Sequence, residues 1–332
     1  MPWTDRIGRR LNLRDLHILL AVAKSGSMGK AATELAISQP SVSKAIAGVE
    51  HAMGLRLLDR GTHGVEPTIY GRALLKCGVA VFDELRQGVK ELEFLADPTS
   101  GELRFGCTET MAAGFASAVS DRLTRQHPRV VLRLIPGDSV TLVNRELRQR
   151  TIDFAIGPIF GLRLDEDVGA DILFDDQFVV MAGAESKWVR RRKLRLADLI
   201  DEPWVLPPTD SVPGISIAQT FRPSGLELPG AQMISFSLPL HYHLLSTGRF
   251  LTMLPLSMLR FGKHLPLKLL PVDVPRNPYP TAIITLKNRT LSPLAQLFIA
   301  CARETVKSLG QKPGTAKVQN KRLFSASSKA GL

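Results

Sequence analysis

The chain has 332 residues, of which 44% are apolar and 22% are charged. This length suits two or three domains, and the composition is typical of a globular protein rather than a disordered one. The sequence contains no uninterrupted apolar run long enough for a membrane span, no secretory signal at its start and no C-x-x-C pair among its three cysteines. These features exclude a membrane protein and a disulfide-stapled secreted protein, and we expect a cytoplasmic protein without a bound metal.

Positive charge is concentrated in two parts of the chain. The formal net charge is +12, which indicates a polyanionic partner. Residues 1–76 hold 11 basic and 6 acidic side chains, whereas residues 77–98 hold 2 and 5. The first segment can therefore face phosphate groups, and the second cannot. Residues 310–332 are rich in Lys, Gly and Ser and contain no acid, so they are predicted to form a basic disordered tail.

Apolar spacing predicts two helices near the start of the chain. The first begins after the capping residue Asn12 and ends at Gly26. Ser27 can cap a second, short helix, and a turn over residues 36–38 follows it. The apolar stripe of this second helix is narrow, so another helix can cross closely over it. The stripe consists of Ala31, Ala32 and Leu35.

A third helix is predicted to begin at Ser38 or Gln39, with Pro40 in its first turn, where proline costs no hydrogen bond. One face is apolar and consists of Val42, Ile46, Val49 and Met53. The opposite face carries mostly small side chains, namely Pro40, Lys44, Ala47, Gly48 and His51, with Ser43 at its edge. Small side chains let a helix backbone enter a DNA groove while a lysine meets phosphate, so this pattern indicates a recognition helix.

Two short segments on either side of residues 61–64 predict a β-hairpin wing. Arg60, Thr62 and His63 would lie at its tip or base, where a wing reaches the DNA backbone or the minor groove. The alternative is that residues 31–53 form an ordinary packed helix pair. The small-residue face, the proline cap and the wing together favour DNA binding.

Thr68 can cap a long helix over residues 69–97, which Pro98 ends. Its apolar residues repeat at alternating spacings of three and four, as in a coiled-coil seam. The seam consists of Leu75, Gly78, Phe82, Leu85, Val89, Leu92 and Ala96. The alternative is an amphipathic helix packed on its own domain. We favour pairing between two chains, because two reading heads can bind a palindromic DNA site.

The residues from Leu13 to Gly71 resemble a known family. The most telling are Ala31-Ala32, Leu35, Ser38-Gln39-Pro40-Ser41-Val42-Ser43-Lys44, Ile46, Glu50, Gly54, Leu57-Leu58-Asp59-Arg60, Thr68 and Gly71. This segment resembles the DNA-binding domain of LysR-type transcriptional regulators. The resemblance implies DNA contacts from positions that correspond here to Gln39, Pro40, Ser43, Lys44, Arg60 and His63. We include the adjoining Ser38, Thr62 and Thr68 in the predicted DNA-binding set.

Three positions depart from the pattern of that family. The family usually has Phe at Leu58, Glu at Asp59 and often Arg at His63. The first two differences conserve packing and charge. The third puts a strong wing contact to phosphate in doubt near neutral pH, where histidine is largely uncharged.

Strands alternate with helices from residue 101 onward, which predicts an α/β fold with a mostly parallel sheet covered on both faces. Strands are expected at residues 103–106, 130–135, 153–156, 178–182, 204–206, 250–254 and 281–286. Helices are expected from Thr108, over residues 142–150 and over residues 292–306. The family resemblance implies two Rossmann-like subdomains, similar to periplasmic solute-binding proteins, with a ligand between them.

We therefore expect a winged helix-turn-helix domain at residues 11–68, a linker and dimerisation helix at 69–98 and an effector-binding regulatory domain at 99–309. The regulatory domain would consist of subdomain I, at about 101–172 and 275–309, and subdomain II, at about 173–274.

Ligands of open α/β sheets bind beyond the C-terminal strand ends, next to helix N-termini. This rule predicts a pocket lined by Cys107, Thr108, Glu109, Thr110, Ser139, Gly157, Pro158, Ser211 and Thr247. The hydroxyls of Thr108 and Thr110 favour a small organic acid or a sugar-like ligand, although Glu109 weakens the case for an acid. The alternative is that the two threonines only cap the helix.

Other signals in the sequence favour structural roles. His241 and His243 would lie on one side of a strand, without an acidic or cysteine partner for a metal nearby. The basic run over residues 190–195 fits a solvated loop, and Cys107 has no second cysteine with which to sense an oxidant. The sequence contains no nucleophile elbow, phosphate loop or paired-carboxylate motif, so we do not expect an enzyme.

The sequence thus predicts a ligand-responsive transcriptional regulator that binds palindromic double-stranded DNA as a homodimer or homotetramer. RNA polymerase is a candidate further partner. The rival is a metabolite-binding or enzymatic α/β protein whose N-terminal helices only mediate oligomerisation. A steep salt dependence of DNA affinity would distinguish the regulator. The effector, the target genes and the direction of regulation are left open.

Overall fold

The computed structural model describes residues 11–61, 64–262 and 265–308 and divides the chain into two compact units, residues 1–92 and 93–332. The predicted disordered tail and two wing residues, Thr62 and His63, lie outside the described residues. None of the helices within these ranges combines the length and the apolar character that a membrane crossing requires.

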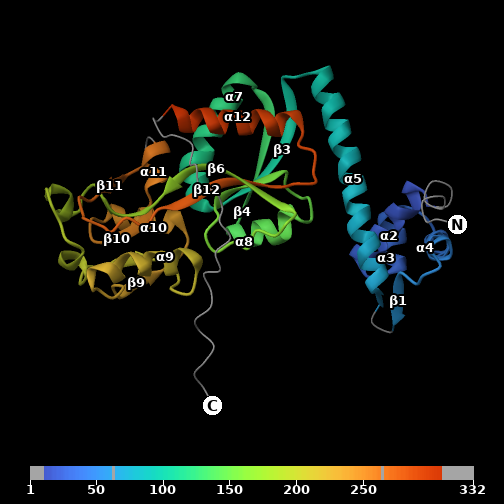
Figure 1. Ribbon diagram of the computed structural model, residues 1–332, viewed down its shortest axis with the longest axis horizontal. Coiled ribbons are helices and arrows are strands. Elements are labelled where there is room, and N and C mark those ends of the chain that lie inside the picture. The colour runs from blue at the N-terminus through green and yellow to red at the C-terminus, as the bar shows by residue number, and fades with distance from the viewer. Residues whose placement is uncertain (1–10, 62–63, 263–264, 309–332) are drawn as a thin grey trace, which may run out of the picture. The chain divides into compact units, whose positions relative to one another are not determined.

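Three helices form the first part of the N-terminal unit: α2 (Leu13–Ser25), α3 (Met28–Glu34) and α4 (Gln39–Met53) (Figure 1). The side chains of Asn12, Ser27 and Ser38 cap these three helices in turn. Each accepts a hydrogen bond from an N–H group in the first turn of its helix. These caps confirm the predicted helix starts, because each satisfies an N–H group that the helix leaves unpaired. The turn between α3 and α4 places Ala36 in the left-handed region, with φ 53°.

The apolar faces of these helices meet in one core. The predicted inner face of α4 is buried, with Val42, Ile46 and Val49 fully inaccessible. Ala31 of α3 is also fully buried, and its small side chain lets α3 and α4 approach closely. The core therefore leaves the opposite face of α4 to the outside.

A β-hairpin follows, made of β1 (Leu58–Gly61) and β2 (Gly64–Pro67), and confirms the predicted wing. The strands pair antiparallel from Leu58 opposite Pro67 to Gly61 opposite Gly64. A carboxylate oxygen of Glu50 on α4 accepts hydrogen bonds from the N–H groups of Leu57 and Leu58, at 2.8 and 3.2 Å. The wing is thereby held at a fixed place beside α4.

The long helix α5 (Ile69–Ala96) changes environment along its length. Its first half packs on the N-terminal core, where Leu75 and Phe82 contact the apolar cluster. A Cβ built at Gly78 would lie 3.0 Å from Leu16, so the two helices touch there. Leu85, Val89 and Leu92 continue the same stripe but are about half to two-thirds exposed. The first half thus fits the amphipathic helix packed on its own domain, and pairing between two chains stays a prediction.

Gly71→Ala is expected to destabilise the N-terminal unit by about 2 kcal/mol or more, because the new Cβ would lie 2.0 Å from the backbone oxygen of Leu57. Urea unfolding of the full chain measures the loss. The matched control is Gly88→Ala in the same helix, where a Cβ meets no atom within 4 Å. The control should gain about 0.5–1 kcal/mol from helix propensity, and equal effects at both glycines would contradict the packing seen here.

The C-terminal unit contains two five-stranded sheets. The first has the order β4-β3-β5-β12-β6. Its strands are β3 (Ser100–Cys107), β4 (Arg129–Pro136), β5 (Phe154–Pro158), β6 (Val168–Asp176) and β12 (Tyr279–Leu286). The helices α7 (Ser117–Gln126) and α12 (Pro293–Lys307) pack on one face, whereas α8 (Ser139–Thr141) and the π-helical turn over residues 142–147 cover the other.

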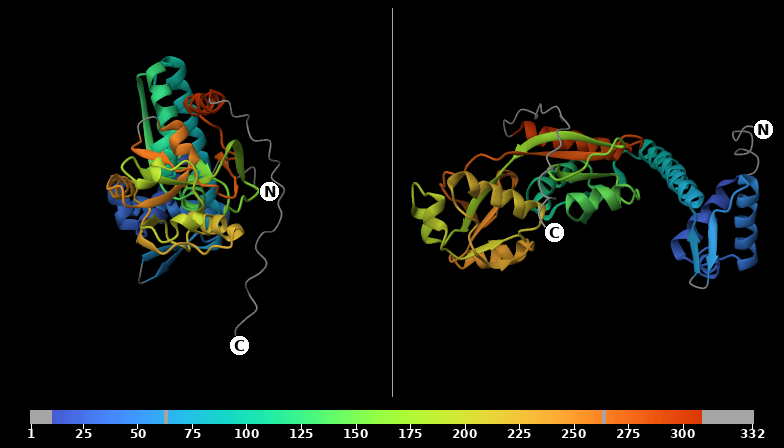
Figure 2. Two further views of the ribbon diagram at one scale, coloured as in Figure 1. Left: turned by 90° about the vertical axis from the view of Figure 1, so that its left-hand side faces the viewer. Right: turned by 60° about the horizontal axis from the view of Figure 1, so that its bottom comes forward.

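The second sheet has the order β11-β7-β10-β8-β9. Its strands are β7 (Phe178–Gly183), β8 (Trp204–Leu206), β9 (Ala231–Ile234), β10 (Leu251–Pro255) and β11 (Leu267–Leu269). The helix α9 (Val212–Phe221) packs on one face, next to the fully buried Trp204. The helices α10 (Leu238–Ser246) and α11 (Leu256–Phe261) pack on the other face. Figure 2 shows the two lobes of this unit from a second direction.

The chain passes from the first sheet to the second between β6 and β7 and returns before β12. This arrangement confirms the predicted α/β class with two Rossmann-like subdomains. The expectation of a mostly parallel sheet was wrong, because in each sheet two strand pairings are parallel and two are antiparallel. The returning strand β12 causes this in the first sheet, since it runs antiparallel to both β5 and β6.

Candidate functional site

The outer face of α4 presents few long side chains. Gln39, Pro40, Lys44, Ala47, Gly48 and His51 are exposed, and Ser43 is half-buried. Only Lys44 in this set combines a full positive charge with a long side chain. A helix with such a face can approach a groove closely, because nothing but the lysine and a few short polar groups stands between its backbone and the base edges.

The hydroxyls of Ser38 and Thr68 are already used inside the protein. Ser38 Oγ accepts the N–H of Ser41 at 3.3 Å and lies 2.8 Å from the Ser41 hydroxyl. Thr68 Oγ1 donates to the carbonyl of Arg56 at 2.8 Å and accepts the N–H of Gly71 at 3.0 Å. Both residues therefore serve as helix caps first, for α4 and α5.

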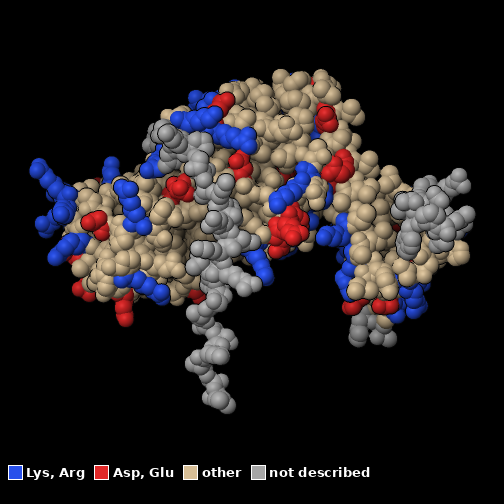
Figure 3. Space-filling view, viewed as in Figure 1, with Lys and Arg blue, Asp and Glu red and all other residues tan. Residues whose placement is uncertain are grey.

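Exposed basic side chains also lie on other elements of the N-terminal unit. Arg60 is exposed on β1 of the wing, and further exposed cations come from α3, from the segment before β1 and from the start of α5. These cations are Lys30, Arg56 and Arg72. Figure 3 shows basic side chains at the lower end of the N-terminal unit. This distribution provides the positive charge that a duplex backbone attracts.

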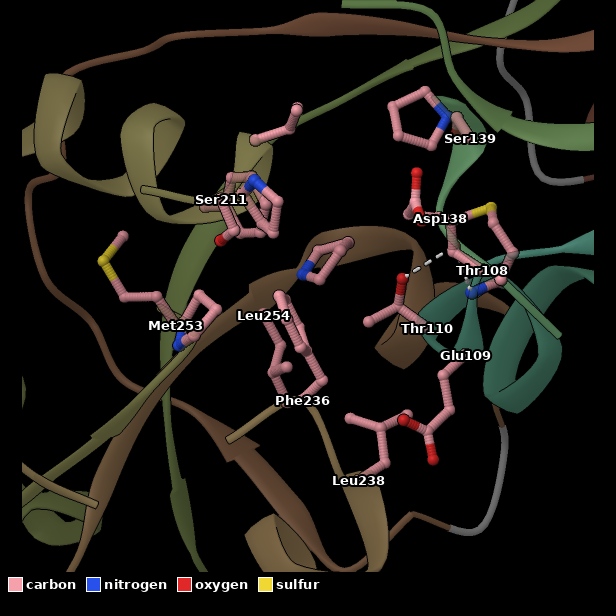
Figure 4. Close-up of a pocket in the computed structure, with 18 of the residues that line it drawn as sticks. Thr108, Glu109, Thr110, Asp138, Ser139, Ser211, Phe236, Leu238, Met253 and Leu254 are labelled. Carbon is pink, nitrogen blue, oxygen red and sulfur yellow. Dashed lines mark hydrogen bonds between the residues drawn. The ribbon is translucent and has the colours of Figure 1, made fainter. Parts of the chain in front are cut away.

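The C-terminal unit holds a cavity of about 710 Å³ between its two sheets (Figure 4). In each sheet three parallel strands, β4, β3 and β5 in one and β10, β8 and β9 in the other, end at this cavity. The residues at or just after these ends are Pro136, Thr108, Pro158, Pro255, Pro207 and Ser235. Two sheets thus supply one site, and its volume suits a small organic molecule.

Six of the nine predicted pocket residues line this cavity, namely Thr108, Glu109, Thr110, Ser139, Pro158 and Ser211. Cys107, Gly157 and Thr247 do not. Cys107 is fully buried in the core of the first sheet. Gly157 lies behind Ser139, whose Oγ would be 2.6 Å from a Cβ at that glycine. Thr247 is exposed at the end of α10, where its hydroxyl donates to the carbonyl of Leu244 at 2.7 Å.

Burial raises the pKa of the Cys107 thiol to about 12. Only about one molecule in 10⁴ then carries the reactive thiolate at pH 8, because each pKa unit changes this fraction tenfold. We expect Cys107 to stay unmodified by a thiol reagent at pH 8 in the native protein and to react at once in denaturant, as peptide mass spectrometry would measure. Rapid native labelling of Cys107 would contradict this environment. Its burial also argues against an oxidant-sensing role.

The polar groups of the cavity are arranged around helix starts. The hydroxyls of Thr108 and Thr110 lie 3.1 Å apart, and that of Thr108 accepts the N–H of Met111. Asp138 accepts two hydrogen bonds from Thr141, from its N–H at 2.9 Å and from its hydroxyl at 2.6 Å. Ser139 is 9% exposed, and its Oγ has no hydrogen-bond partner within the described part of the chain.

Sequence reasoning missed most of the apolar lining. Phe160, Phe178, Phe236 and Tyr279 come from four separate segments, and none of them carries a local signal for ligand binding. Phe236 follows β9, a strand of four residues that the sequence did not predict. Had β9 been recognised, the rule that ligands lie beyond strand ends would have found Phe236.

The two histidines that were expected on a strand lie on the helix α10 instead. His241 is buried, with its ring nitrogens 3.1 Å from the hydroxyl of Thr252 and 2.9 Å from the carbonyl of Ser235. His243 is exposed. Across the residues that the structure describes, no cluster of His, Cys and acidic side chains is placed to hold a metal ion.

Two family models match the chain over its two parts. Residues 13–72 match the bacterial regulatory helix-turn-helix protein of the lysR family, and residues 96–307 match the LysR substrate binding domain. The chain is a LysR-type transcriptional regulator. The second match alone covers more than half of its length. The enzymatic alternative is therefore set aside, and the regulator binds DNA.

Curated relatives align with nearly the whole of this LysR-type regulator. The HTH-type transcriptional regulator GbpR of Azospirillum brasilense is 29% identical over 304 residues, covering 89% of the chain and 86% of that protein. The HTH-type transcriptional regulator TdcA of Escherichia coli K12 is 26% identical, and the alignment covers 87% of this chain and 91% of TdcA.

Solved structures agree on the fold of the regulator. The LysR family transcriptional regulator CbnR matches with a TM-score of 0.58 at 19% identity, and the match covers 89% of this chain and 99% of CbnR. A full-length OxyR variant from Pseudomonas aeruginosa matches with a TM-score of 0.60, also at 19% identity. The match covers 92% of this chain and 99% of the OxyR chain.

Proposed function

We propose that the regulator reads duplex DNA through α4 and the wing, that it does so as an oligomer paired along α5, and that a small molecule in the C-terminal cavity controls it. The observation that carries the DNA-reading part is the outer face of α4. It combines small exposed residues with one lysine, and further exposed cations lie on other elements of the same unit. CbnR, which has the same fold, has been solved in full length in complex with its target DNA.

In this proposal the amide of Gln39, the hydroxyl of Ser43 and the ring of Pro40 meet base edges, while Lys44 and Arg60 meet phosphates. Phosphate contacts give affinity for every sequence, whereas contacts to base edges select among sequences. The roles of Ser38 and Thr68 are then to hold the N-termini of α4 and α5 in place, since their hydroxyls are occupied by internal hydrogen bonds.

Lys44→Ala is expected to weaken binding to selected and to random duplexes by a similar factor. The slope of log affinity against log salt should fall by about 1, because one phosphate contact releases about one counterion. Gln39→Ala should instead change site preference and leave the salt slope unchanged. Fluorescence anisotropy at several salt concentrations measures both quantities.

Arg125→Ala is the matched control for the charge. Arg125 is an exposed cation in the C-terminal unit, 3.0 Å from its partner Asp121, and its removal changes the net charge as the loss of Lys44 does. A loss of affinity as large for Arg125→Ala as for Lys44→Ala would mean that net charge alone governs binding, and it would overturn the assignment of Lys44.

The oligomer is proposed because half of the apolar seam on α5 is uncovered. Leu85, Val89 and Leu92 are 49%, 52% and 67% exposed, and Leu95 beside them is 71% exposed. Exposed apolar stripes of this kind mark surfaces that another protein covers. A second copy of α5 offers the same stripe, and a two-fold pair of heads suits a palindromic site.

The cavity is proposed as the effector site because two sheets share it. A ligand that touches strand ends from both sheets binds more tightly to one arrangement of the two subdomains than to another. Such a difference in affinity is what a ligand needs to shift an equilibrium between two states of the oligomer. Titrating a ligand while DNA affinity is measured tests the coupling, and a saturating cavity ligand that leaves DNA binding and transcription unchanged would contradict it.

A further inference from the structure

We propose that the cavity takes an organic cation, an amine carried on an apolar body. This inference rests on the proposed effector function of the cavity and adds the chemical class of its ligand. It departs from the small organic acid that the hydroxyls of Thr108 and Thr110 suggested at the level of the sequence.

The first argument is the charge of the lining. Glu109, Asp138 and Asp210 border the cavity, and among the described residues that line it none is Lys or Arg. None of the three carboxylates forms an ion pair within the described part of the chain. All three residues are exposed, and three negative charges without a counterion still attract a cation and repel a carboxylate, with salt reducing the effect.

The protonation states of two lining residues also favour a negatively charged cavity. Burial raises the pKa of Asp138, but the hydrogen bonds from Thr141 and from nearby backbone N–H groups together outweigh it and hold that pKa below the ordinary value. This carboxylate therefore stays negative at neutral pH. Burial lowers the pKa of His241, so the imidazole at the cavity is neutral. The lining therefore carries no compensating positive side chain at pH 7.

The partial positive charges of helix N-termini at the cavity do not outweigh the negative charge of its carboxylates. An N-terminus acts as about half a positive charge, and the effect is confined to the first turn. Three helix N-termini at the cavity each have one N–H group already bonded to a capping side chain. Thr108 caps the helix after β3, Ser211 caps α9 and Asp138 caps α8. Asp138 at the N-cap of α8 and Glu109 in the first turn of the helix after β3 also place full negative charges at two of them.

The second argument is an aromatic wall. The ring of Tyr279 lies 4.7 Å from that of Phe160 and 5.3 Å from that of Phe178, measured between centroids. Phe236 is 55% exposed and lies among the residues that face the cavity in the close-up. Aromatic faces attract ammonium groups, and their rings bury the apolar body that carries the charge.

The third argument is a hydrogen-bonding group without a partner. Ser139 is 91% buried, lines the cavity, and its Oγ has no partner among the described residues. A buried polar atom without a hydrogen bond is costly, so a ligand that satisfies it gains affinity. The Ser139 hydroxyl lies in the same part of the cavity as the carboxylate of Asp138, and it can accept from an ammonium N–H or donate to an oxygen of another ligand. The carboxylates and the aromatic wall select an amine, and the hydroxyl is compatible with one.

The test uses the full chain and three probes that share one apolar body. These are 4-phenylbutylamine, 4-phenylbutanol and 4-phenylbutyrate, with D-glucose as a representative polyol. Isothermal titration at neutral pH and physiological ionic strength measures each dissociation constant. We expect the amine to bind at least about tenfold more tightly than the alcohol, and the carboxylate to bind most weakly of the three.

A pair of double variants separates local from global charge. Glu109→Gln with Asp210→Asn removes two carboxylates of the cavity. Glu166→Gln with Glu227→Gln removes two exposed carboxylates of the same unit that do not line the cavity. We expect the first pair to weaken amine binding at least about tenfold and the second pair to leave it unchanged.

The outcomes distinguish the ligand class from the function of the site. Tightest binding by the carboxylate or by glucose would overturn the proposed class and leave the effector function standing. Equal binding of amine and alcohol, or no difference between the two double variants, would also overturn the class. If none of the four probes binds, the proposed class is wrong, and the effector function is decided separately by the coupling between ligand binding and DNA affinity.

Discussion

Arg289→Met is expected to destabilise the C-terminal unit by about 3–5 kcal/mol, because it would leave a buried carboxylate without its partner. The guanidinium of Arg289 lies 3.1 Å from a carboxylate oxygen of Asp153 and also donates to the carbonyl of Ile152. The two side chains of the ion pair are only 2% and 3% exposed. The pair joins the segment before β5 to the segment between β12 and α12, so the first sheet depends on it.

Urea unfolding of the full chain, followed by tryptophan fluorescence and circular dichroism, measures this loss. Arg303→Met is the matched control, since Arg303 pairs with Asp171 at 2.6 Å but both side chains are about half exposed. An exposed pair of this kind contributes less than about 1 kcal/mol. Arg289→Met combined with Asp153→Leu should recover much of the loss, since no charge is then left unpaired. Similar losses for the two single variants would show that burial of the pair does not matter.

Leu85→Asp is expected to convert the oligomer into monomers and to weaken operator binding by about 100-fold or more. A carboxylate buried in an apolar seam costs several kcal/mol, and a single head loses the second half-site. Analytical ultracentrifugation measures the mass, and fluorescence anisotropy measures the DNA affinity. The expected result is a monomer that retains helix content.

Leu269→Asp is the control for this substitution. Leu269 lies on β11 and is 50% exposed, against 49% for Leu85, so both substitutions exchange an equally exposed leucine. The control should keep the mass and the DNA affinity of the unaltered protein. A dimer that survives Leu85→Asp would contradict pairing along α5 and would place the interface elsewhere.

Local chemistry explains why so much of the N-terminal unit could be predicted. Helix starts depend on one capping residue and the few positions after it, and Asn12, Ser27 and Ser38 carry that information within four residues. The inner face of α4 follows from spacing alone, since four buried residues repeat at intervals of three and four. The half-exposed stripe of α5 also follows from spacing, but spacing does not show what covers the stripe.

The C-terminal unit was harder because its pairings are long-range. The strand β6 begins with Val168-Gly169-Ala170-Asp171, which has neither a clean alternation nor a continuous apolar run. It is a strand because β12, more than 100 residues away, pairs along it. The helix α10 was mistaken for a strand because three residues, His241-Tyr242-His243, cannot distinguish a period of 2 from one of 3.6.

The cavity residues also divide into those that local sequence signals predict and those that depend on long-range pairing. Thr108 and Ser211 were found because they follow predicted strands and cap helices, and Ser139 because it follows a predicted strand. These are local properties. Phe160 and Tyr279 line the site only because β5 and β12 are neighbours in the sheet. The sign of the pocket charge also required the structure, since it depends on which carboxylates gather without a cation.

The central claim is that the nearly bare outer face of α4 enters the duplex groove. Selection from a pool of random duplexes, followed by anisotropy with the full chain, gives the affinities for the selected and a scrambled sequence. We expect a selected palindrome that binds at least about 10³-fold more tightly than its scrambled form at physiological salt. Ala47→Glu, which puts a long acid on that face, should abolish the difference. A protein that shows no preference for any duplex, or that keeps its preference with Glu at position 47, would contradict the claim.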